Sequence, residues 1–313
     1  MDTLIGGVFT SKLGELPLVY DCHENYPGLV KGAISSRGAN ILHKIEAYLL
    51  KYCAGIMAAG PAGYIRLNDM LNIGSSAPFN ANDEDAFKVL SKPQSEFLNS
   101  RITRVGNAKR LDAYPLSRIQ KRKRNKKFRI LYIGVLEKHP SRGILETAIT
   151  VNKMKDVQFD IGGFGTLVPT IKKVCEKMAN VNYIGSIHPD NVPLQTIESD
   201  AVLMALDPKN DNNRMSAPNK LFEAMSAGVP IITCKELLMG QFVENEEIGL
   251  TFEWGKWDRL KAAIMKLIYD KELQAKMGRR GRKLAEKTHN WEKCEERIES
   301  LYRYVKLNSI SPA

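Results

Sequence analysis

The segment 216–230 holds the side chains whose types and spacing are best suited to chemistry. Lys220 and Glu223 stand three residues apart, and Asn219 precedes Glu223 by four, so that on a helix these side chains share one face. Free N–H groups and the positive end of the helix dipole add to the charge of the lysine. Together they fit a nucleotide sugar, with cations for the diphosphate and a carboxylate for the ribose hydroxyls. The alternative is an exposed Lys/Glu pair, which typically stabilises a helix by only ~0.2 to 0.5 kcal/mol.

The same segment carries the signals of a short helix followed by a strand. Ser216 suits the N-cap position, and Pro218 suits the first turn, where its missing N–H costs nothing. Gly228 and Pro230 are typical of a helix end, so the helix is predicted to run for about three turns. The apolar run 231–234 then indicates a buried strand.

Composition describes an ordinary globular chain. Its 313 residues are 43% apolar and 26% charged, which is enough for two cores of about 100 to 200 residues each. Its apolar runs fall short of the ~20 residues of a membrane helix, and its N-terminal residues lack the pattern of a secretion signal. The five cysteines are widely spaced and form no C-x-x-C, which argues against disulfides or a zinc site and favours the cytoplasm.

The net charge of +11 is concentrated in one place. The segment 118–129 carries eight basic residues and no acidic one, so the rest of the chain has a net charge of only +3. We interpret this basic run as a solvated linker, with contact to an anionic membrane surface as the alternative, since each basic residue near such a surface contributes about 1 kcal/mol. Phe128 is its only aromatic residue, which disfavours nucleic acid as a partner. The expected localisation is cytoplasmic, with peripheral attachment to the inner face of the membrane as an option.

From residue 128 onward, apolar strands alternate with helical stretches. The predicted strands are 128–133, 157–161, 181–184, 201–206 and 229–234, and the predicted helices between them are 144–154, 167–178, 194–199 and 217–227. This alternation indicates a parallel sheet with helices on both faces, whose ligands bind beyond the carboxyl ends of the strands. Three further helices, 256–269, 271–288 and 291–305, are expected to cover this sheet.

Ahead of the basic run the pattern is sparser. Strands are predicted at 16–21, 54–59 and 101–105, with a helix at 39–52. These elements are too few for a doubly wound domain as large as the one that follows. We therefore expect part of the N-terminal domain to be missing ahead of Met1.

Six short motifs occur in order along the chain. They are VYDCHE at 19–24, VGN at 105–107, IG at 133–134 with RG at 142–143, IGGFG at 161–165, GSIHP at 185–189 and SAPNKLFEAMSAGVP at 216–230. In this order the chain resembles nucleotide-sugar-dependent glycosyltransferases of the GT-B fold, in the large retaining family four. The resemblance runs from Val19 to about Val305. It implies two Rossmann-like domains, the second binding the sugar donor and the first binding the acceptor.

The resemblance implies roles for residues of the second domain. Gly134 is expected near the donor phosphates, and Glu223 is expected to hold the ribose. Arg142 and Lys220 are expected to neutralise the leaving diphosphate in place of a metal, because the donor loops lack a D-x-D sequence or a carboxylate cluster able to hold Mg²⁺. The other expected donor-binding residues are Lys138, Gly163, Ile187, Asn219 and Leu221, with backbone near Ile187 and His188 meeting the base. The simpler interpretations are that Arg142 caps a helix and that the glycines serve only as turn residues.

In the first domain, His23 matches a histidine that points toward the donor sugar in the family, where it stabilises charge in the transition state. A structural role at a strand end is the alternative. The chain also departs from the family pattern. Met215 stands where many relatives have a second glutamate, and Leu136 stands where an arginine is common, so Lys138 is assigned as its substitute. The first strand and the glycine-rich acceptor loop, on the order of 80 residues at ordinary domain sizes, have no counterpart.

The expected fold class is therefore α/β of the GT-B type, with two Rossmann-like domains built on parallel sheets, the N-terminal one incomplete. The expected boundaries are 1–115 for the partial acceptor-side domain, 116–127 for a basic linker, 128–290 for the donor-binding domain and 291–313 for a C-terminal helix and tail. The expected reaction moves a sugar from a nucleoside diphosphate donor to an acceptor hydroxyl with retention, in glycan or cell-surface polysaccharide synthesis. The expected partners are a nucleotide sugar, with UDP and GDP both open, and a glycan or lipid-linked acceptor. No cofactor is required.

Three alternatives remain at this stage. The chain is an inactive or incomplete glycosyltransferase-like fragment or subunit that needs a partner for acceptor binding. It is a nucleotide-sugar epimerase of the same fold, which needs acid/base carboxylates in the cleft and has only Asp21 and Glu24 as candidates. It is a basic nucleic-acid-binding module.

Overall fold

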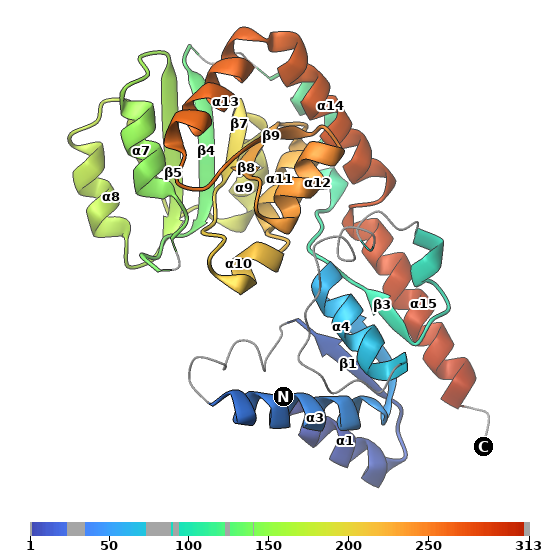
Figure 1. Cartoon of the computed structure of the whole chain (residues 1–313). Coiled ribbons are helices and arrows are strands. Elements are labelled where there is room, and N and C mark those ends of the chain that lie inside the picture. Colours follow the sequence, from blue (N-terminus) through green and yellow to red (C-terminus); the bar gives the residue numbers. More distant parts are fainter. Residues whose placement is uncertain are drawn as a thin grey trace. The chain divides into compact units, whose positions relative to one another are not determined.

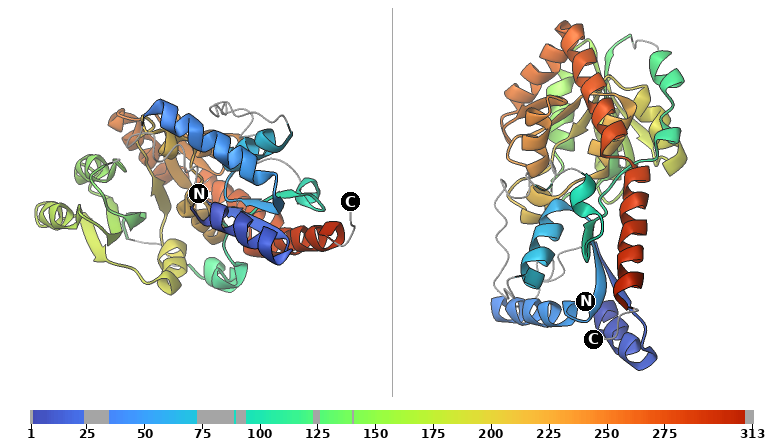
Figure 2. Two further views of the ribbon diagram at one scale, coloured as in Figure 1. Left: turned by 90° about the horizontal axis from the view of Figure 1, so that it is seen from below. Right: turned by 90° about the vertical axis from the view of Figure 1, so that its right-hand side faces the viewer.

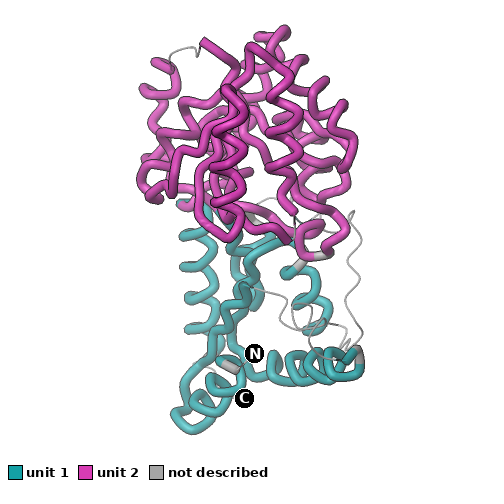
Figure 3. The backbone as a smooth tube through the Cα atoms, turned by 90° about the vertical axis from the view of Figure 1, so that its left-hand side faces the viewer, with its two compact units in different colours: residues 1–107, 292–313 teal, residues 108–291 magenta. Residues whose placement is uncertain are grey.

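The computed structural model describes residues 2–23, 35–72, 89, 94–122, 126–139 and 141–309. The chain divides into two compact units, shown in Figure 3. Unit 1 is formed by residues 1–107 and 292–313, and unit 2 by residues 108–291. Within the described residues, no helix is both long enough and apolar enough to pass through a membrane.

Unit 2 is built on a parallel sheet of six strands in the order β6-β5-β4-β7-β8-β9 (Figure 1). The strands are β4 Phe128–Val135, β5 Val157–Phe164, β6 Val181–Gly185, β7 Ala201–Met204, β8 Ile231–Cys234 and β9 Gly249–Phe252. The first five confirm the strands predicted from the apolar runs. The sixth, β9, was not predicted.

Helices cover both faces of this sheet, since every residue of β7 and β8 is buried (Figure 2). The helices are α6 Leu116–Gln120, α7 Ile144–Asn152, α8 Val168–Cys175, α9 Val192–Ile197, α10 Asp211–Met215, α11 Asn219–Ala227, α12 Leu238–Asn245, α13 Trp257–Tyr269 and α14 Lys271–Lys287, with 3-10 turns at Leu111–Ala113 and Pro189–Asn191. Alternating β and α elements therefore give the doubly wound arrangement that the sequence predicts.

Unit 1 contains a parallel sheet of three strands in the order β1-β2-β3. Its elements are α1 Asp2–Gly14, β1 Leu18–Cys22, α3 Ser36–Leu50, β2 Cys53–Ala58, α4 Pro61–Asn72, η1 Gln94–Phe97, β3 Ile102–Arg104 and α15 Trp291–Ser309. The three strands and α3 agree with the predicted elements, whereas α1 and α4 were not predicted. Glu24, which belongs to the first sequence motif, lies outside the described residues.

The last helix departs from the expectation that all three C-terminal helices cover the large sheet. α15 belongs to unit 1, where a Cβ added at Gly55 of β2 would lie 2.8 Å from Val305 Cγ2. The close approach has a simple cause, because Gly55 presents no side chain to the helix. The C-terminal helix therefore packs on the small sheet.

Part of the basic run is folded into unit 2 rather than extended. Arg122 donates to the carbonyl of Ser199 at 3.2 Å, and Arg129 Nε lies 2.6 Å from Asp160 Oδ2. Arg118 lies in the short helix α6. The exposed cations in the described part of the run are Arg118, Lys121, Lys126 and Lys127.

Candidate functional site

Two glycines bring β4 and β5 together at their carboxyl ends. Gly134 and Gly163 are register partners, with φ of +157° and +139°. A Cβ at Gly163 would lie 1.8 Å from the carbonyl oxygen of Gly134, and one at Gly134 would lie 2.6 Å from Lys220 Nζ. Only glycine fits at either place, so backbone and the lysine ammonium meet where ligands bind in this kind of sheet.

Lys220 lies in the first turn of α11 with only 9% of its surface exposed. Its Nζ lies 4.3 Å from the centroid of the Tyr132 ring, and the Tyr132 hydroxyl donates to the carbonyl of Val135 at 3.0 Å. Burial lowers the pKa of Lys220 to about 8, an effect that Arg142 increases and Glu223 opposes. Burial makes the charged ammonium costly, and a bound anion offsets this cost by pairing with the charge.

Arg142 supplies a second cation near Lys220. It precedes Gly143, the left-handed N-cap residue of α7 with φ of 61°. Its Nε is buried and has no hydrogen-bond partner within the described residues. Arg142 also opposes the effect of burial, which raises the pKa of Tyr132 to about 12. Neither Arg142 nor Lys220 forms an ion pair with any residue that the structure describes. The two cations are therefore available to a diphosphate.

Glu223 and Asn219 lie on the outward face of α11, as their spacing predicts. Both are bound by Lys109, whose Nζ lies 3.1 Å from Glu223 Oε1 and 2.9 Å from Asn219 Oδ1. The charge of Glu223 also acts on Tyr114, whose pKa is raised first by burial and then by this carboxylate. Lys109, Tyr114 and Tyr132 interact with the predicted residues Glu223, Asn219 and Lys220 but were not themselves predicted from the sequence. The contact of Lys109 with Asn219 joins residues 110 positions apart and leaves no local sequence pattern. Tyr132 could have been noticed, because it is a polar-tipped residue within a largely apolar strand.

The helix start differs from the prediction that Ser216 is its N-cap. Pro218 is the N-cap of α11, and Ser216 ends α10 instead, where its Oγ donates to the carbonyl of Asn213 at 3.0 Å. The cause lies in the proline, which disfavours helical backbone in the residue before it. Gly228, by contrast, ends the helix in the left-handed conformation with φ of 63°, as predicted.

The remaining predicted donor residues occupy varied positions. Leu221 is fully buried, and its N–H donates to the carbonyl of Pro218 at 3.1 Å. Lys138 is exposed in the loop after β4. Ile187 packs close to Gly162, where an added Cβ would lie 3.0 Å from Ile187 Cγ1. His188 is exposed beside Asp190, with Nδ1 to Oδ2 at 3.4 Å.

His23 belongs to unit 1 and follows β1 directly. Its Nε2 lies 3.0 Å from Asp21 Oδ2, and 72% of its side chain is exposed. The carboxylate two residues earlier thus orients the ring. The imidazole remains accessible to a ligand.

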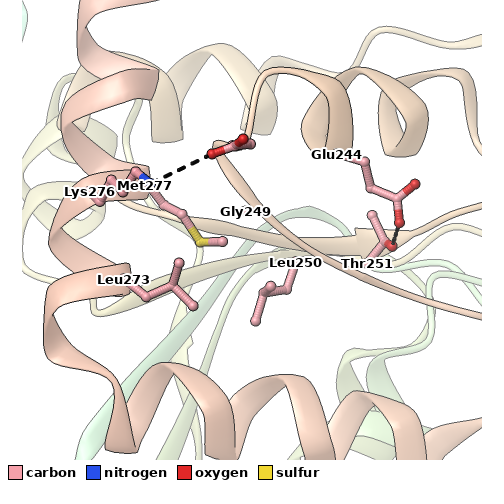
Figure 4. Close-up of a pocket in the computed structure, with 8 residues that line it drawn as sticks. Glu244, Gly249, Leu250, Thr251, Leu273, Lys276 and Met277 are labelled. Atoms are coloured by element: carbon pink, nitrogen blue, oxygen red, sulfur yellow. Dashed lines mark hydrogen bonds and ion pairs between the residues drawn. The ribbon is translucent and has the colours of Figure 1, made fainter.

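A separate hollow of about 340 Å³ lies at the β9 edge of the large sheet (Figure 4). Its lining residues are Glu244, Glu247, Gly249, Leu250, Thr251, Leu273, Lys276 and Met277. Glu247 is paired with Lys276 and Arg280. The hollow shares no residue with the cluster at Lys220 and lies three strands away from β4. Within the described part of the chain, His, Cys, Asp and Glu side chains nowhere gather in threes as a metal site would require.

Comparison with known proteins relates most of unit 2 to one family. Residues 115–284 match the family model of glycosyl transferases group 1. Over 147 residues the chain is 23% identical to the GDP-mannose-dependent alpha-(1-6)-phosphatidylinositol monomannoside mannosyltransferase of Mycobacterium tuberculosis. That match covers 46% of this chain and 38% of the mannosyltransferase, so it spans much less than two thirds of the relative.

Solved structures match nearly the whole chain. Anabaena HepE in complex with UDP is 16% identical with a TM-score of 0.65, and the match covers 98% of this chain and 76% of HepE. Sucrose-phosphate synthase from Thermosynechococcus elongatus is 18% identical with a TM-score of 0.67, covering 98% of this chain and 73% of the synthase. At these identities the likeness establishes the fold, and the α/β GT-B class expected from the sequence is confirmed.

Proposed function

Because the chain belongs to the glycosyl transferases group 1 family, we propose that it moves a sugar from a nucleoside diphosphate donor to an acceptor hydroxyl with retention of configuration. The observation that carries the proposal is the buried ammonium of Lys220 against Gly134, together with Arg142, whose charge acts on Lys220 and whose buried Nε has no hydrogen-bond partner among the described residues. Fixed cations in a site of low polarity bind a diphosphate and stabilise the charge that develops on it as a leaving group.

The proposed mechanism assigns one task to each residue. Lys220 and Arg142 neutralise the diphosphate while the bond to the sugar breaks, and Glu223 accepts hydrogen bonds from the ribose. The acceptor hydroxyl attacks from the face that the leaving group occupied and passes its proton to a phosphate oxygen. His23 stabilises positive charge on the sugar ring through its hydrogen-bonding imidazole. This chemistry requires no cofactor.

The donor base and the acceptor are proposed only as classes. HepE is solved with UDP, and the mannosyltransferase is GDP-mannose-dependent, so the binding experiments below use both UDP and GDP. The acceptor class is a glycan or a lipid-linked glycan, in glycan or cell-surface polysaccharide synthesis. The second candidate is a glycosyltransferase-like subunit that binds donor but needs a partner for acceptor. Donor hydrolysis or transfer by the purified chain separates the two.

Replacing Glu223 with alanine is expected to weaken UDP or GDP binding by about 10- to 100-fold, since hydrogen bonds to a charged group contribute about 1.5 to 3 kcal/mol. Isothermal titration calorimetry measures the affinity. Glu176→Ala, a change at an exposed carboxylate after α8, is the matched control and is expected to bind as the wild type does. Unchanged affinity in the Glu223 variant would remove this residue from the donor site.

We further propose that the chain works in the cytoplasm, attached peripherally to an anionic membrane. The exposed cations of the basic run support this, and so does a surface of unit 1 that we call the α1/α3 face. It consists of the exposed residues Ile5, Phe9, Lys12 and Leu13 of α1 and Ile41, Lys44, Ile45 and Tyr48 of α3. On each helix these positions share one stripe that mixes apolar and basic side chains, as in helices that lie in a membrane interface.

The two halves of the α1/α3 face are joined by direct contacts. Lys12 Nζ lies 3.8 Å from the centroid of the Tyr52 ring, and the Tyr52 and Tyr48 hydroxyls are 2.7 Å apart. Five of its large side chains, Ile5, Phe9, Leu13, Ile41 and Tyr48, are at least half exposed. A contiguous surface of this kind commonly marks an interaction site.

Flotation with vesicles tests the membrane proposal. The wild type is expected to float with phosphatidylglycerol vesicles, to float less as salt is added, and to float poorly with phosphatidylcholine. Phe9→Ser with Leu13→Ser tests the α1/α3 face, and Lys126→Gln with Lys127→Gln tests the basic run. Ile149→Ser, at a similarly exposed position of unit 2, is the control. Flotation that is insensitive to salt and to both double variants would refute membrane attachment through either feature.

A further inference from the structure

Lys109 lies beside the polar face of α11 and is fixed at both of its ends. Its Nζ lies 2.9 Å from Asn219 Oδ1 and 3.1 Å from Glu223 Oε1. Its main chain forms a parallel bridge with Asn290, and its carbonyl accepts the N–H of Trp291 at 3.0 Å. The ammonium therefore has a defined position over the first turns of the helix.

The Lys109–Glu223 pair is sheltered but reachable. Relative exposures of 23% for the Lys109 side chain and 14% for Glu223 leave room for a ligand at the rim of the pair. Two of the three ammonium N–H groups account for the contacts to Asn219 and Glu223, and one carboxylate oxygen accepts from the lysine. What remains is one donor and at least one acceptor side by side. A hydroxyl group is complementary to both, because it donates and accepts at once.

Resting on the donor site proposed above, we infer that Lys109 is a specificity-determining residue that reads a pentose hydroxyl of the nucleotide together with Glu223. The hydroxyl donates to the carboxylate and accepts from the remaining N–H of Lys109. A deoxy-pentose offers neither bond, so it leaves the ammonium and the carboxylate without that partner. The pair thus selects ribonucleotides over deoxyribonucleotides, a discrimination that a hydrogen-bonding site performs well.

If Lys109 instead blocked the site, its removal would change nucleotide affinity in the opposite direction. If Lys109 blocked Glu223 and had to leave before the pentose could bind, its removal would tighten nucleotide binding. The direction of the change in affinity therefore separates a reading lysine from an occluding one.

The experiment measures the binding of UDP, GDP and their 2′-deoxy and 3′-deoxy forms to the full chain by calorimetry. The wild type is expected to prefer the ribonucleotide to at least one deoxy form by about tenfold or more. Lys109→Met is expected to reduce that preference, because ribonucleotide binding weakens more than binding of the deoxy form while Glu223 still accepts from the hydroxyl. Lys109→Arg is expected to retain part of the preference. Lys153→Met, at an exposed lysine after α7, is the matched control and is expected to behave as the wild type.

The outcomes are distinct. A Lys109→Met variant with the wild-type preference, or with tighter ribonucleotide binding, overturns the inference while the donor site stands. A wild type that binds neither UDP nor GDP overturns the donor site and this inference with it. Circular dichroism and thermal melting of the variant exclude a general loss of structure as the cause of weaker binding.

Discussion

Replacing Lys220 with methionine is expected to weaken nucleoside diphosphate binding severely and, at the same time, to stabilise the ligand-free protein. Methionine matches the length of the buried stem but removes the ammonium that lies against Gly134 and Tyr132. Truncation of a buried charge partner costs about 2 to 5 kcal/mol of binding, so the affinity is expected to fall about 100-fold or more. Calorimetry with UDP and GDP provides the measurement.

The stabilisation follows from the lowered pKa of Lys220, about 8 against an ordinary value of 10.5. Between these two pH values the unfolded chain binds more protons than the folded one, so the wild type becomes more stable as pH rises through this window. Below pH 8 it carries the full cost of a buried charge, which is up to about 3 kcal/mol. Lys220→Met is therefore expected to be more stable than the wild type at pH 7, and the difference is expected to close by about pH 10.

Urea denaturation at pH 7 and pH 10 measures this difference. Nucleotide binding is expected to depend on pH as well. The donor affinity of the wild type is expected to fall above pH 8, because the Lys220 ammonium of the free protein then loses its proton. Lys172→Met, at an exposed lysine of α8, is the control and is expected to change neither property. A methionine variant that is less stable than the wild type at pH 7 would show that the lysine contributes to folding instead of opposing it.

The large sheet was predictable because its strands are buried on both faces. Runs such as Ala201 to Leu206 are apolar without interruption, and a helix pattern separates most runs from the next. β9 was missed because Gly249 and Thr251 break the apolar run and its four residues are too few to show a pattern.

α1 was missed for a different physical reason. Leu4 and Val8 are buried, but the adjacent Ile5 and Phe9 are exposed, so the helix shows no contrast between an apolar and a polar face. Gly6 and Gly7 further weaken the helix signal. The same apolar exposure that hid the helix from sequence analysis is the feature that makes the α1/α3 face a candidate for membrane contact.

In the candidate site, relations between residues close in sequence were predictable, whereas contacts between residues distant in sequence were not. That Asn219 and Glu223 share one face of α11 was predictable, because their relation is the spacing along one helix. Lys109 was not, because it reaches α11 only through the fold of unit 2. The buried state of Lys220 was also beyond the sequence, since it depends on Tyr132 and on two glycines from neighbouring strands.

Replacing Gly163 with alanine is expected to prevent stable folding of unit 2 or to destabilise it by at least about 4 kcal/mol. The added Cβ would lie 1.8 Å from the carbonyl oxygen of Gly134, so β4 and β5 must separate at the point where they meet Lys220. No side-chain movement relieves this overlap, because the obstructing atom belongs to the backbone. Backbone strain adds to the cost, since φ at Gly163 is +139°.

Gly185→Ala is the matched control, at the end of the neighbouring strand β6. Its φ of +85° is equally unusual, but no atom lies within 4 Å of an added Cβ. Its expected cost is therefore that of the backbone conformation alone, about 1 to 2 kcal/mol. Urea denaturation compares the two variants. Equal destabilisation would mean that both glycines are needed only for their φ, whereas a much larger loss at Gly163 would show that the strand ends must touch to build the cradle beneath Lys220.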